Sequence, residues 1–393
     1  MRYDYLIIGG GMVADSAARG IREQDATGSI GILGADPDAP YTRPALSKKL
    51  WTDPEFGRDQ VSLDTASDTD ASVHTGTRVI SVDRSNSSVT TESGDTHEYG
   101  KLLLATGATP TRIELAPSPR VVYFRTFADY RALRELTKTA DHIAVVGGGY
   151  IGTEIAAALS VQGVKVTLVT SDSVLGGHMF PQSLAAGFDK GFAGHGVTVR
   201  RGTRVVSGAE ASARVQLQLD DGSTVEADGV VFGLGVRPDT ELAEAAGLAV
   251  DDGVIVDEFL RTEDERVYAA GDVANYPDAI LGRRRIEHVD NATEMGKAAG
   301  RNMAGAADPY TYTPYFYSDV YDDGYQAIGT VSTTLDVVED WKSVGKEGVV
   351  YYLDDDAVVR GVLMWNVWEG LDVVRTLLAD KKPQTEQSLR GLI

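Results

Sequence analysis

The stretch Tyr5-Leu6-Ile7-Ile8-Gly9-Gly10-Gly11-Met12-Val13-Ala14 decides the fold predicted for this chain. An apolar run too short for a helix leads into three glycines and then into a helix-compatible segment that ends near Glu23. This order predicts strand, tight turn and helix, and Gly9-x-Gly11-x-x-Ala14 fits the dinucleotide-binding motif in its alanine form. Gly9 permits the turn, and Gly11 lets a pyrophosphate approach the N–H groups at the helix start.

The same pattern returns in the middle of the chain. Ile143 to Gly152 reads IAVVGGGYIG, a strand that enters the full motif Gly147-x-Gly149-x-x-Gly152, and a second strand is predicted at Val164–Val169. One such motif is a weak signal, whereas two nucleotide-binding units in one chain are far more specific. The sequence therefore predicts an α/β protein with two Rossmann-like dinucleotide-binding domains.

Composition narrows the class of protein and of partner. The chain has 393 residues and a formal net charge of −21, which argues against nucleic acid as a partner. It contains no cysteine, which removes disulfides, thiolate metal sites and cysteine catalysis, and we expect no metal site. Asp outnumbers Glu by 38 to 20, consistent with either adaptation to high salt or an ordinary acidic protein. We expect no membrane span, because no apolar window is long enough, and a cytoplasmic location, because the chain starts directly in a strand.

The rest of the chain supplies further candidate elements. Ser29–Gly34 is predicted to be the second strand of the first unit, and Asp36 beyond it is either the carboxylate for the adenosine ribose or a turn residue before Pro37. Residues 61–89 read as short strands separated by polar turns. Buried strands ending in small residues are predicted at 102–110, 229–238 and 267–272, where Asp272 either faces the ligand crevice or caps the next helix.

The last 85 or so residues differ in residue pattern from the rest of the chain. Seven aromatic residues crowd positions 310–325, and strands are predicted at 326–331, 349–353 and 358–365, followed by a helix to Leu378. This pattern predicts a separate C-terminal α+β domain. The aromatic cluster is interpreted as its core or as a dimer face.

Several of these stretches together resemble one family. The chain is similar to the flavin-dependent NAD(P)H oxidoreductases with two dinucleotide-binding domains, of the glutathione-reductase-like fold. It looks closest to prokaryotic proteins like apoptosis-inducing factor, beside the ferredoxin reductases of oxygenase systems. The motifs that carry the resemblance are PYTRPALSKKLW, LLLATGATP, VFGLGVRPDT, YAAGDVANY, RRIEHVDNATEMGKAAGRNM, TPYFYSDVYDDGYQAIG and VVRGVLMWNVW.

The resemblance implies three domains and two cofactors. FAD would bind residues 1–113 and 245–307, NAD(P)H would bind the inserted residues 114–244, and residues 308–393 would form the C-terminal domain. The implied FAD contacts are Gly9, Gly10, Gly11, Met12, Val13, Ala14, Ala35, Asp36, Arg43, Lys48, Val79, Ala105, Thr106, Gly107, Arg131, Gly271, Asp272, His288 and Tyr317. The implied NAD(P)H contacts are Gly147, Gly148, Gly149, Tyr150, Ile151, Gly152, Asp172, Gly235, Glu287 and Gln326.

Four residues receive catalytic roles from the resemblance. Lys48 and Glu154 look like the family's salt-bridged pair beside flavin N5; the alternative is a solvated lysine and a glutamate that complements the helix dipole. His288 would lie beneath the flavin or near the nicotinamide, or be structural. Tyr317 stands where relatives carry a tryptophan that stacks at the ring system.

We expect NADH rather than NADPH as the coenzyme, because no Arg or Lys lies between Thr170 and Pro181 and Asp172 can serve the ribose. The leading functional prediction is an FAD-dependent NADH oxidoreductase that passes electrons to a small molecule or a small redox protein. One alternative is a ferredoxin or rubredoxin reductase. Another is an NADH-sensing protein with slow turnover that forms a homodimer on reduction.

Overall fold

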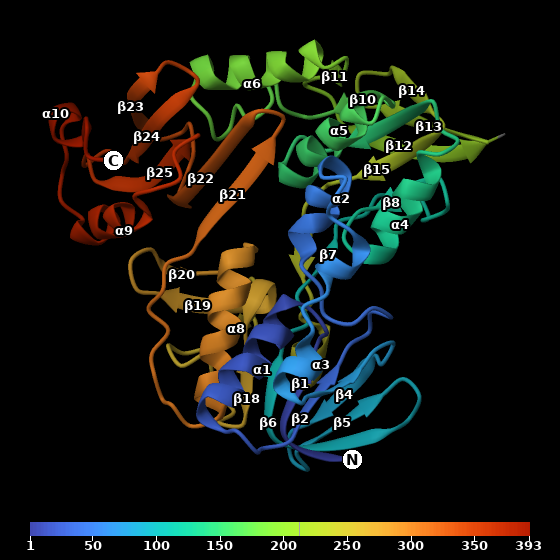
Figure 1. The fold of residues 1–393 in the computed structure, drawn as a ribbon, viewed down its shortest axis with the longest axis vertical. Coiled ribbons are helices and arrows are strands. Elements are labelled where there is room, and N and C mark those ends of the chain that lie inside the picture. The colour runs from blue at the N-terminus through green and yellow to red at the C-terminus, as the bar shows by residue number, and fades with distance from the viewer. Residues whose placement is uncertain (212) are drawn as a thin grey trace. The chain divides into compact units, whose positions relative to one another are not determined.

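The computed structural model describes residues 1–211 and 213–393, and these group into two compact units (Figure 1). Unit 1 comprises Met1–Arg43, Gly57–Thr109 and Arg237–Pro314, and unit 2 comprises Pro44–Phe56, Pro110–Val236 and Tyr315–Ile393. The finer division into three domains remains a prediction.

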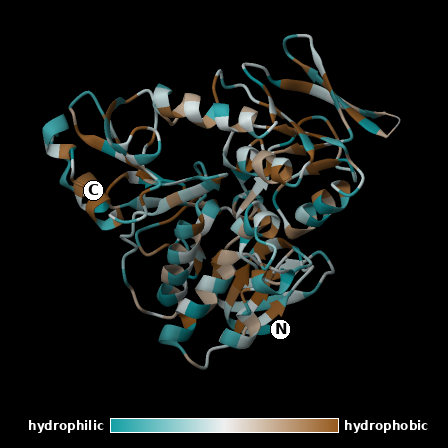
Figure 2. Ribbon diagram, turned by 45° about the horizontal axis from the view of Figure 1, so that its top comes forward, coloured by the Kyte–Doolittle hydropathy of each residue, from teal (hydrophilic) through white to brown (hydrophobic). Residues whose placement is uncertain are grey.

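Unit 1 is built on a seven-stranded sheet with the order β3-β2-β1-β6-β5-β4, in which β18 also pairs with β6. β1, β2, β3, β6 and β18 pair in parallel, whereas β4 and β5 join as an antiparallel hairpin. Figure 2 shows brown, hydrophobic segments along the strands beside the N-terminus and teal segments on the surrounding helices and loops. The strands are β1 (Arg2–Ile8), β2 (Ile30–Leu33), β3 (Ser72–His74), β4 (Val79–Asp83), β5 (Ser88–Thr91), β6 (Thr96–Leu104) and β18 (Val267–Ala269).

Helices α1 (Met12–Gln24) and α8 (Val289–Met303) lie side by side over this sheet (Figure 1). Their backbones approach closely because small residues face one another: a methyl group at Gly20 would overlap the Lys297 carbonyl, and one at Gly300 would overlap the Ala17 carbonyl. The remaining elements of the unit are α3 (Thr65–Thr69), α7 (Glu241–Ala245), η2 (Arg58–Val61), η3 (Gly271–Val273), β17 (Val254–Ile255), β19 (Ala274–Asp278) and β20 (Gly282–Arg284).

Unit 2 contains a second parallel sheet with the order β11-β10-β9-β15-β8. Helix α5 (Tyr150–Val161) follows β9 and packs on β9 and β10, as the second glycine motif predicts. Strands β12, β13 and β14 pair in that order as an antiparallel sheet. The strands are β8 (Val121–Tyr123), β9 (His142–Val146), β10 (Lys165–Val169), β11 (Thr198–Arg200), β12 (Val205–Ala211), β13 (Arg214–Leu219), β14 (Thr224–Ala227) and β15 (Gly229–Phe232).

The C-terminal part of unit 2 is a five-stranded antiparallel sheet with the order β21-β22-β25-β24-β23. This sheet, with the helices after it, confirms the predicted α+β fold of this part of the chain. It also contains β21 and β23, which were not predicted from the sequence. The strands are β21 (Tyr315–Val320), β22 (Asp323–Gly329), β23 (Asp336–Ser343), β24 (Glu347–Leu353) and β25 (Val359–Trp365). The helices of the unit besides α5 are η1 (Arg43–Leu46), which begins at the unit boundary, α2 (Lys49–Thr52), α4 (Phe127–Leu136), α6 (Gln182–Gly194), α9 (Leu371–Asp380) and α10 (Glu386–Leu389). Two short strands, β7 (Ala108–Pro110) and β16 (Val236–Pro238), pair with each other.

Two further observations bear on the sequence predictions. Residues 61–89 are not all strands and turns, because α3 forms at Thr65–Thr69, where no apolar periodicity announces a helix. Within the described residues, none of the helices is long and apolar enough to cross a membrane.

Candidate active site

The first glycine motif forms the turn that the sequence predicts. Gly9 has φ of +115°, and a Cβ at this position would overlap the Ala105 carbonyl at the end of β6, so only glycine fits. Gly11 is the N-cap of α1, and the nearest atom to a Cβ built there is Arg43 Nη2 at 3.9 Å. The start of α1 thus presents backbone N–H groups and an open approach, with a guanidinium beside it, which suits a pyrophosphate.

Other predicted FAD residues also lie in unit 1, and one of them contacts this helix. Gly271 packs against Val13, since a Cβ at Gly271 would overlap the valine side chain. His288 is the N-cap of α8, and burial lowers the pKa of its imidazole to about 4, so the ring is neutral at pH 7. Asp272 lies in η3, where its carbonyl accepts a hydrogen bond from Arg285 Nη1 at 3.2 Å.

Asp36 follows β2, as the motif requires, but its carboxylate also has protein partners. Tyr41 Oη donates to Oδ2 at 3.0 Å, and the Asp38 N–H donates to Oδ1 at 3.0 Å. The turn interpretation and the ribose interpretation are therefore compatible, because a carboxylate can accept several hydrogen bonds. Ala35 beside it is exposed, whereas Val79 is buried in β4.

The strand ends predicted to approach a ligand are small and close-packed. Ala105, Thr106 and Gly107 follow β6, and Thr106 Oγ1 donates to the Asp239 carbonyl at 2.7 Å. In unit 2, Gly235 has φ of +78°, and its carbonyl accepts from the Thr111 N–H at 2.9 Å. Both segments keep side chains short where the parallel strands end.

The second glycine motif repeats the geometry in unit 2. Gly147 has φ of +120°, and a Cβ there would overlap the Gly233 carbonyl; one at Gly152 would overlap the carbonyl of Gly147. A Cβ on Gly149, the N-cap of α5, would have no neighbour within 4 Å. Ile151 on the first turn is 39% exposed, which leaves an apolar side chain next to the open helix start.

The remaining predicted coenzyme residues are held by protein contacts. Asp172, three residues past β10, faces His178, with Oδ2 3.3 Å from Nδ1. Tyr150 Oη donates to the sulfur of Met179 at 3.0 Å, and Gln326 Nε2 donates to the Val367 carbonyl at 2.9 Å. Glu287 belongs to unit 1, where it pairs with Arg285 at 2.6 Å. Arg131, assigned to FAD, lies on α4 of unit 2 with its guanidinium 4.7 Å from the centre of the Phe127 ring.

Lys48 and Glu154 form a buried ion pair within unit 2. Lys48 Nζ lies 2.7 Å from Glu154 Oε1, and the glutamate side chain is 5% exposed. Glu154 is on the second turn of α5, next to the open helix start at Gly149. The alternative of a solvated lysine is wrong, because only 14% of the Lys48 side chain is exposed and its ammonium is paired with Glu154.

Two residues in this cluster were not predicted. Ser47 Oγ donates to Glu154 Oε2 at 2.6 Å, and Ser318 Oγ donates to Glu154 Oε1 at 2.6 Å. Tyr317, next to Ser318, places its ring 5.5 Å from Lys48 Nζ, within cation–π range. No local sequence pattern could have identified the serines, because they lie more than 100 positions from Glu154.

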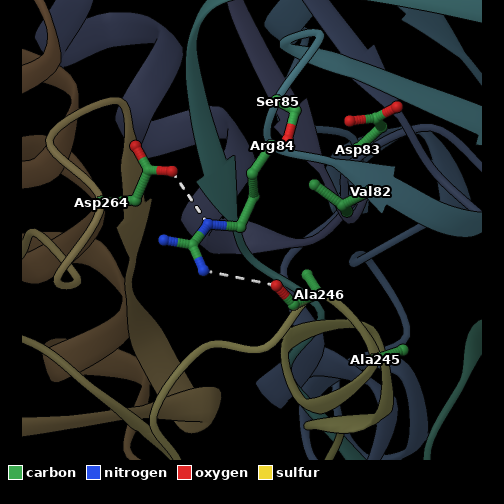
Figure 3. A pocket seen from close by; sticks show the side chains of 7 residues that line it. All are labelled: Val82, Asp83, Arg84, Ser85, Ala245, Ala246 and Asp264. Atoms are coloured by element: carbon green, nitrogen blue, oxygen red, sulfur yellow. Dashed lines mark hydrogen bonds and ion pairs between the residues drawn. The ribbon is translucent and has the colours of Figure 1, made fainter.

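A surface pocket of unit 1 lies apart from the predicted site residues, none of which line it (Figure 3). Arg84 crosses it: its Nε donates to Asp264 at 2.9 Å and its Nη1 to the Ala246 carbonyl at 3.4 Å (Figure 3). These bonds join the turn after β4 to the segment after α7 and to the loop before β18, so we interpret this arginine as structural.

Two glycine turns at helix starts, each in its own parallel α/β layer, define a protein that binds two dinucleotides. The family model of the pyridine nucleotide-disulphide oxidoreductases matches residues 3–296. The chain is 33% identical over 386 residues to the ferredoxin–NAD(+) reductase component of the anthranilate 1,2-dioxygenase system of Burkholderia cepacia. That alignment covers 95% of this chain and 94% of the relative. The chain therefore belongs to the pyridine nucleotide-disulphide oxidoreductase family.

Two further comparisons agree. The chain is 30% identical over 421 residues to mitochondrial apoptosis-inducing factor 1 of Dictyostelium discoideum, covering 97% of this chain and 79% of that protein. The crystal structure of the ferredoxin reductase for the CYP199A2 system of Rhodopseudomonas palustris superposes with a TM-score of 0.88. It is 30% identical, and the match covers 98% of this chain and 96% of that one.

These findings confirm the predicted resemblance, fold class and enzyme class. The protein is an FAD-dependent NAD(P)H oxidoreductase with the fold of flavoproteins that have two dinucleotide-binding domains. The residues present fit both cofactors: at Gly11 and at Gly149, a methyl group would fill the space that a phosphate needs, while the neighbouring glycines are required by the protein's own backbone.

Proposed function

We propose that this enzyme takes electrons from NADH and delivers them to a small iron–sulfur protein of the ferredoxin type. The main structural support for this proposal is the buried Lys48–Glu154 ion pair beside the second glycine turn. The acceptor is suggested by two of the relatives, both ferredoxin reductases by name. Bound FAD supplies a two-electron acceptor that can release its electrons one at a time, so one NADH serves two one-electron acceptors.

In this proposal the ion pair acts electrostatically. Taking a lysine out of water is costly, and Glu154 compensates by holding the ammonium in one place. A fixed positive charge in a low-dielectric site stabilises negative charge that develops nearby, without the reorganisation that water would need. Lys48 would thus favour hydride acceptance by the flavin. His288, the N-cap residue of α8, would contact FAD bound in unit 1 with a neutral ring.

For coenzyme choice, we propose a preference for NADH. Asp172 presents a carboxylate in the loop after β10, which suits the ribose hydroxyls of NADH and repels the 2′-phosphate of NADPH. The expected kcat/KM is at least about tenfold higher for NADH than for NADPH. Asp172→Asn should reduce this NADH-to-NADPH ratio of kcat/KM. Equal kcat/KM values for the two coenzymes would contradict the preference.

The function is tested by anaerobic titration of the FAD-loaded protein with NADH, followed by a panel of acceptors. We expect bleaching of the flavin absorbance with one equivalent of NADH and faster turnover with a [2Fe–2S] ferredoxin than with a rubredoxin, a quinone or ferricyanide. Comparable rates with every acceptor would refute the assignment to ferredoxin. Lys48→Ala should slow the bleaching, and a wild-type rate in this variant would refute the role of the ion pair.

Homodimer formation on reduction and a cytoplasmic location remain predictions. Sedimentation of the protein with and without NADH tests whether reduction produces a homodimer. The family assignment does not require a homodimer. A redox-sensing role is therefore not needed to explain this chain.

A further inference from the structure

Strand β21 carries a polar residue where its pattern calls for an apolar one. Its side chains alternate between two faces: Phe316, Ser318 and Val320 are buried, whereas the three residues between and before them are more exposed. Ser318 is fully buried, at 0% exposure. A hydroxyl at such a position is unfavourable unless it has a hydrogen-bond partner, so the serine needs an explanation beyond packing.

Its partner is the carboxylate of Glu154. Ser318 Oγ donates to Oε1 at 2.6 Å, the same oxygen that accepts from Lys48 Nζ at 2.7 Å. Ser47 Oγ donates to the other oxygen, Oε2, at 2.6 Å. Both carboxylate oxygens are therefore held by three donors, which come from two segments of the chain that are remote in sequence from Glu154 and from each other.

This arrangement fixes the direction of the lysine. Lys48 has four rotatable side-chain bonds, so its ammonium adopts one position only if the anchor that it binds is itself fixed. A carboxylate held by one donor can rotate about its terminal torsion, which is broad, whereas hydroxyls on both oxygens oppose that rotation. Ser318 Oγ also lies 3.5 Å from Lys48 Nζ, so it contacts both members of the pair.

We propose that Ser318, together with Ser47, positions the Lys48–Glu154 pair for reaction with the nicotinamide coenzyme. The C-terminal sheet thereby contributes to the reactive site through β21, besides packing against α5. This inference rests on the proposed role of the ion pair. It assigns the serines as positioning residues that act through Glu154.

The primary test compares Ser318→Ala with a matched control, Ser160→Ala. Ser160 also lies on α5 and also bonds to the C-terminal part of the chain, through a 2.9 Å hydrogen bond with Tyr321 Oη in the turn between β21 and β22, but it does not contact Glu154. The measurements are the anaerobic rate of flavin bleaching at saturating NADH and the Kd for NAD⁺ by calorimetry. We expect Ser318→Ala to slow bleaching about tenfold, the effect of losing one hydrogen bond to a charged group. Its Kd should change less than about twofold, Ser160→Ala should match wild type, and Ser318→Thr, which retains the hydroxyl, should recover most of the rate.

A second measurement does not depend on turnover. Urea unfolding of Ser318→Ala, Glu154→Gln and the double variant forms a thermodynamic cycle, and we expect the double variant to lose less than the sum of the single losses. Additive losses would overturn the proposal. Ser47→Ala, which removes the donor to the other oxygen, should slow bleaching in the same direction and serves if Ser318→Ala does not fold.

The outcomes separate the two levels of the argument. If Ser318→Ala and Ser47→Ala are bleached at the wild-type rate while Lys48→Ala is slow, the positioning role fails and the role of the ion pair stands. If Lys48→Ala is also bleached at the wild-type rate, the proposed function of the pair fails as well. If Ser160→Ala slows the reaction as much as Ser318→Ala, the effect belongs to the packing of α5 on the sheet, and the positioning role is refuted.

Discussion

The substitution Gly149→Ala distinguishes a glycine needed by a ligand from one needed by the fold. Gly149 has φ of −79° and ψ of −172°, which any residue adopts, and a Cβ there would have no neighbour within 4 Å. We therefore expect the free energy of unfolding to change by less than about 1 kcal/mol, since the loss of N-cap preference is offset by a stiffer unfolded chain. The same change at Gly147 would combine φ of +120° with a backbone overlap and should prevent folding of the turn.

Coenzyme binding should respond differently. A methyl group at the start of α5 keeps phosphate oxygens from the backbone N–H groups, which they must approach to about 2.9 Å. Losing one charge-assisted hydrogen bond costs about 2 kcal/mol, or roughly thirtyfold in Kd. The assay is calorimetric titration of the FAD-loaded variant with NAD⁺, together with urea unfolding.

Gly187→Ala is the matched control, because Gly187 is an exposed glycine in α6 with open space around it and no predicted contact with coenzyme. It should leave the Kd unchanged. A Gly149→Ala protein that binds NAD⁺ within about twofold of the wild-type Kd would refute the reasoning, because the open space would then not be where the coenzyme phosphates bind.

Three other predictions follow from the ion pair, from a buried histidine and from surface charge. Lys48→Met should lower the free energy of unfolding in urea by about 3 kcal/mol, because it leaves Glu154 buried without its counter-ion; a loss below about 1 kcal/mol would contradict this. Because burial lowers the pKa of His288 to about 4, its contribution to stability is complete above pH 6.5, the ordinary value, and about 3 kcal/mol of it is lost as the pH falls to 4. His288→Gln should flatten this part of the pH dependence of urea unfolding, and an unchanged slope would be evidence against it. If the acidic composition reflects adaptation to salt, the melting temperature should rise between about 0.1 and about 2 M KCl, and equal values at both concentrations would argue for an ordinary acidic protein.

The parts of the fold predicted from sequence are those in which a steric rule acts over a few residues. At Gly9 and at Gly147 the backbone lies against the carbonyl of another segment, so only glycine fits. The strand–turn–helix order can therefore be recognised from a stretch of about ten residues. Strand β21 was not predicted, because its aromatic residues occur on both faces and hide the alternation between buried and exposed positions. Helix α3 is five residues long and lacks an apolar stripe, so composition alone suggested turns.

The candidate site shows the same limit. The roles of Lys48 and Glu154 came from the resemblance, and the structure shows that the two side chains meet. Ser47 and Ser318 could not be found in this way, because their hydrogen bonds depend on how distant segments pack. A serine on the buried face of a strand is the one signal available, and it becomes visible only once the strand and its register are known.

The contact between α1 and α8 also bears on how this protein can change over evolutionary time. Gly20 and Gly300 each lie against the carbonyl of the opposite helix, so the gain of a single methyl group would force the two helices apart. The N-cap residues of the two helices are Gly11, which is predicted to bind a nucleotide, and His288, so any such separation would alter the surroundings of both. Residues at the contact between α1 and α8 should therefore change more slowly in evolution than residues on the outer faces of the same helices. An insertion into either helix would be tolerated only beyond the last turn that contacts the other helix.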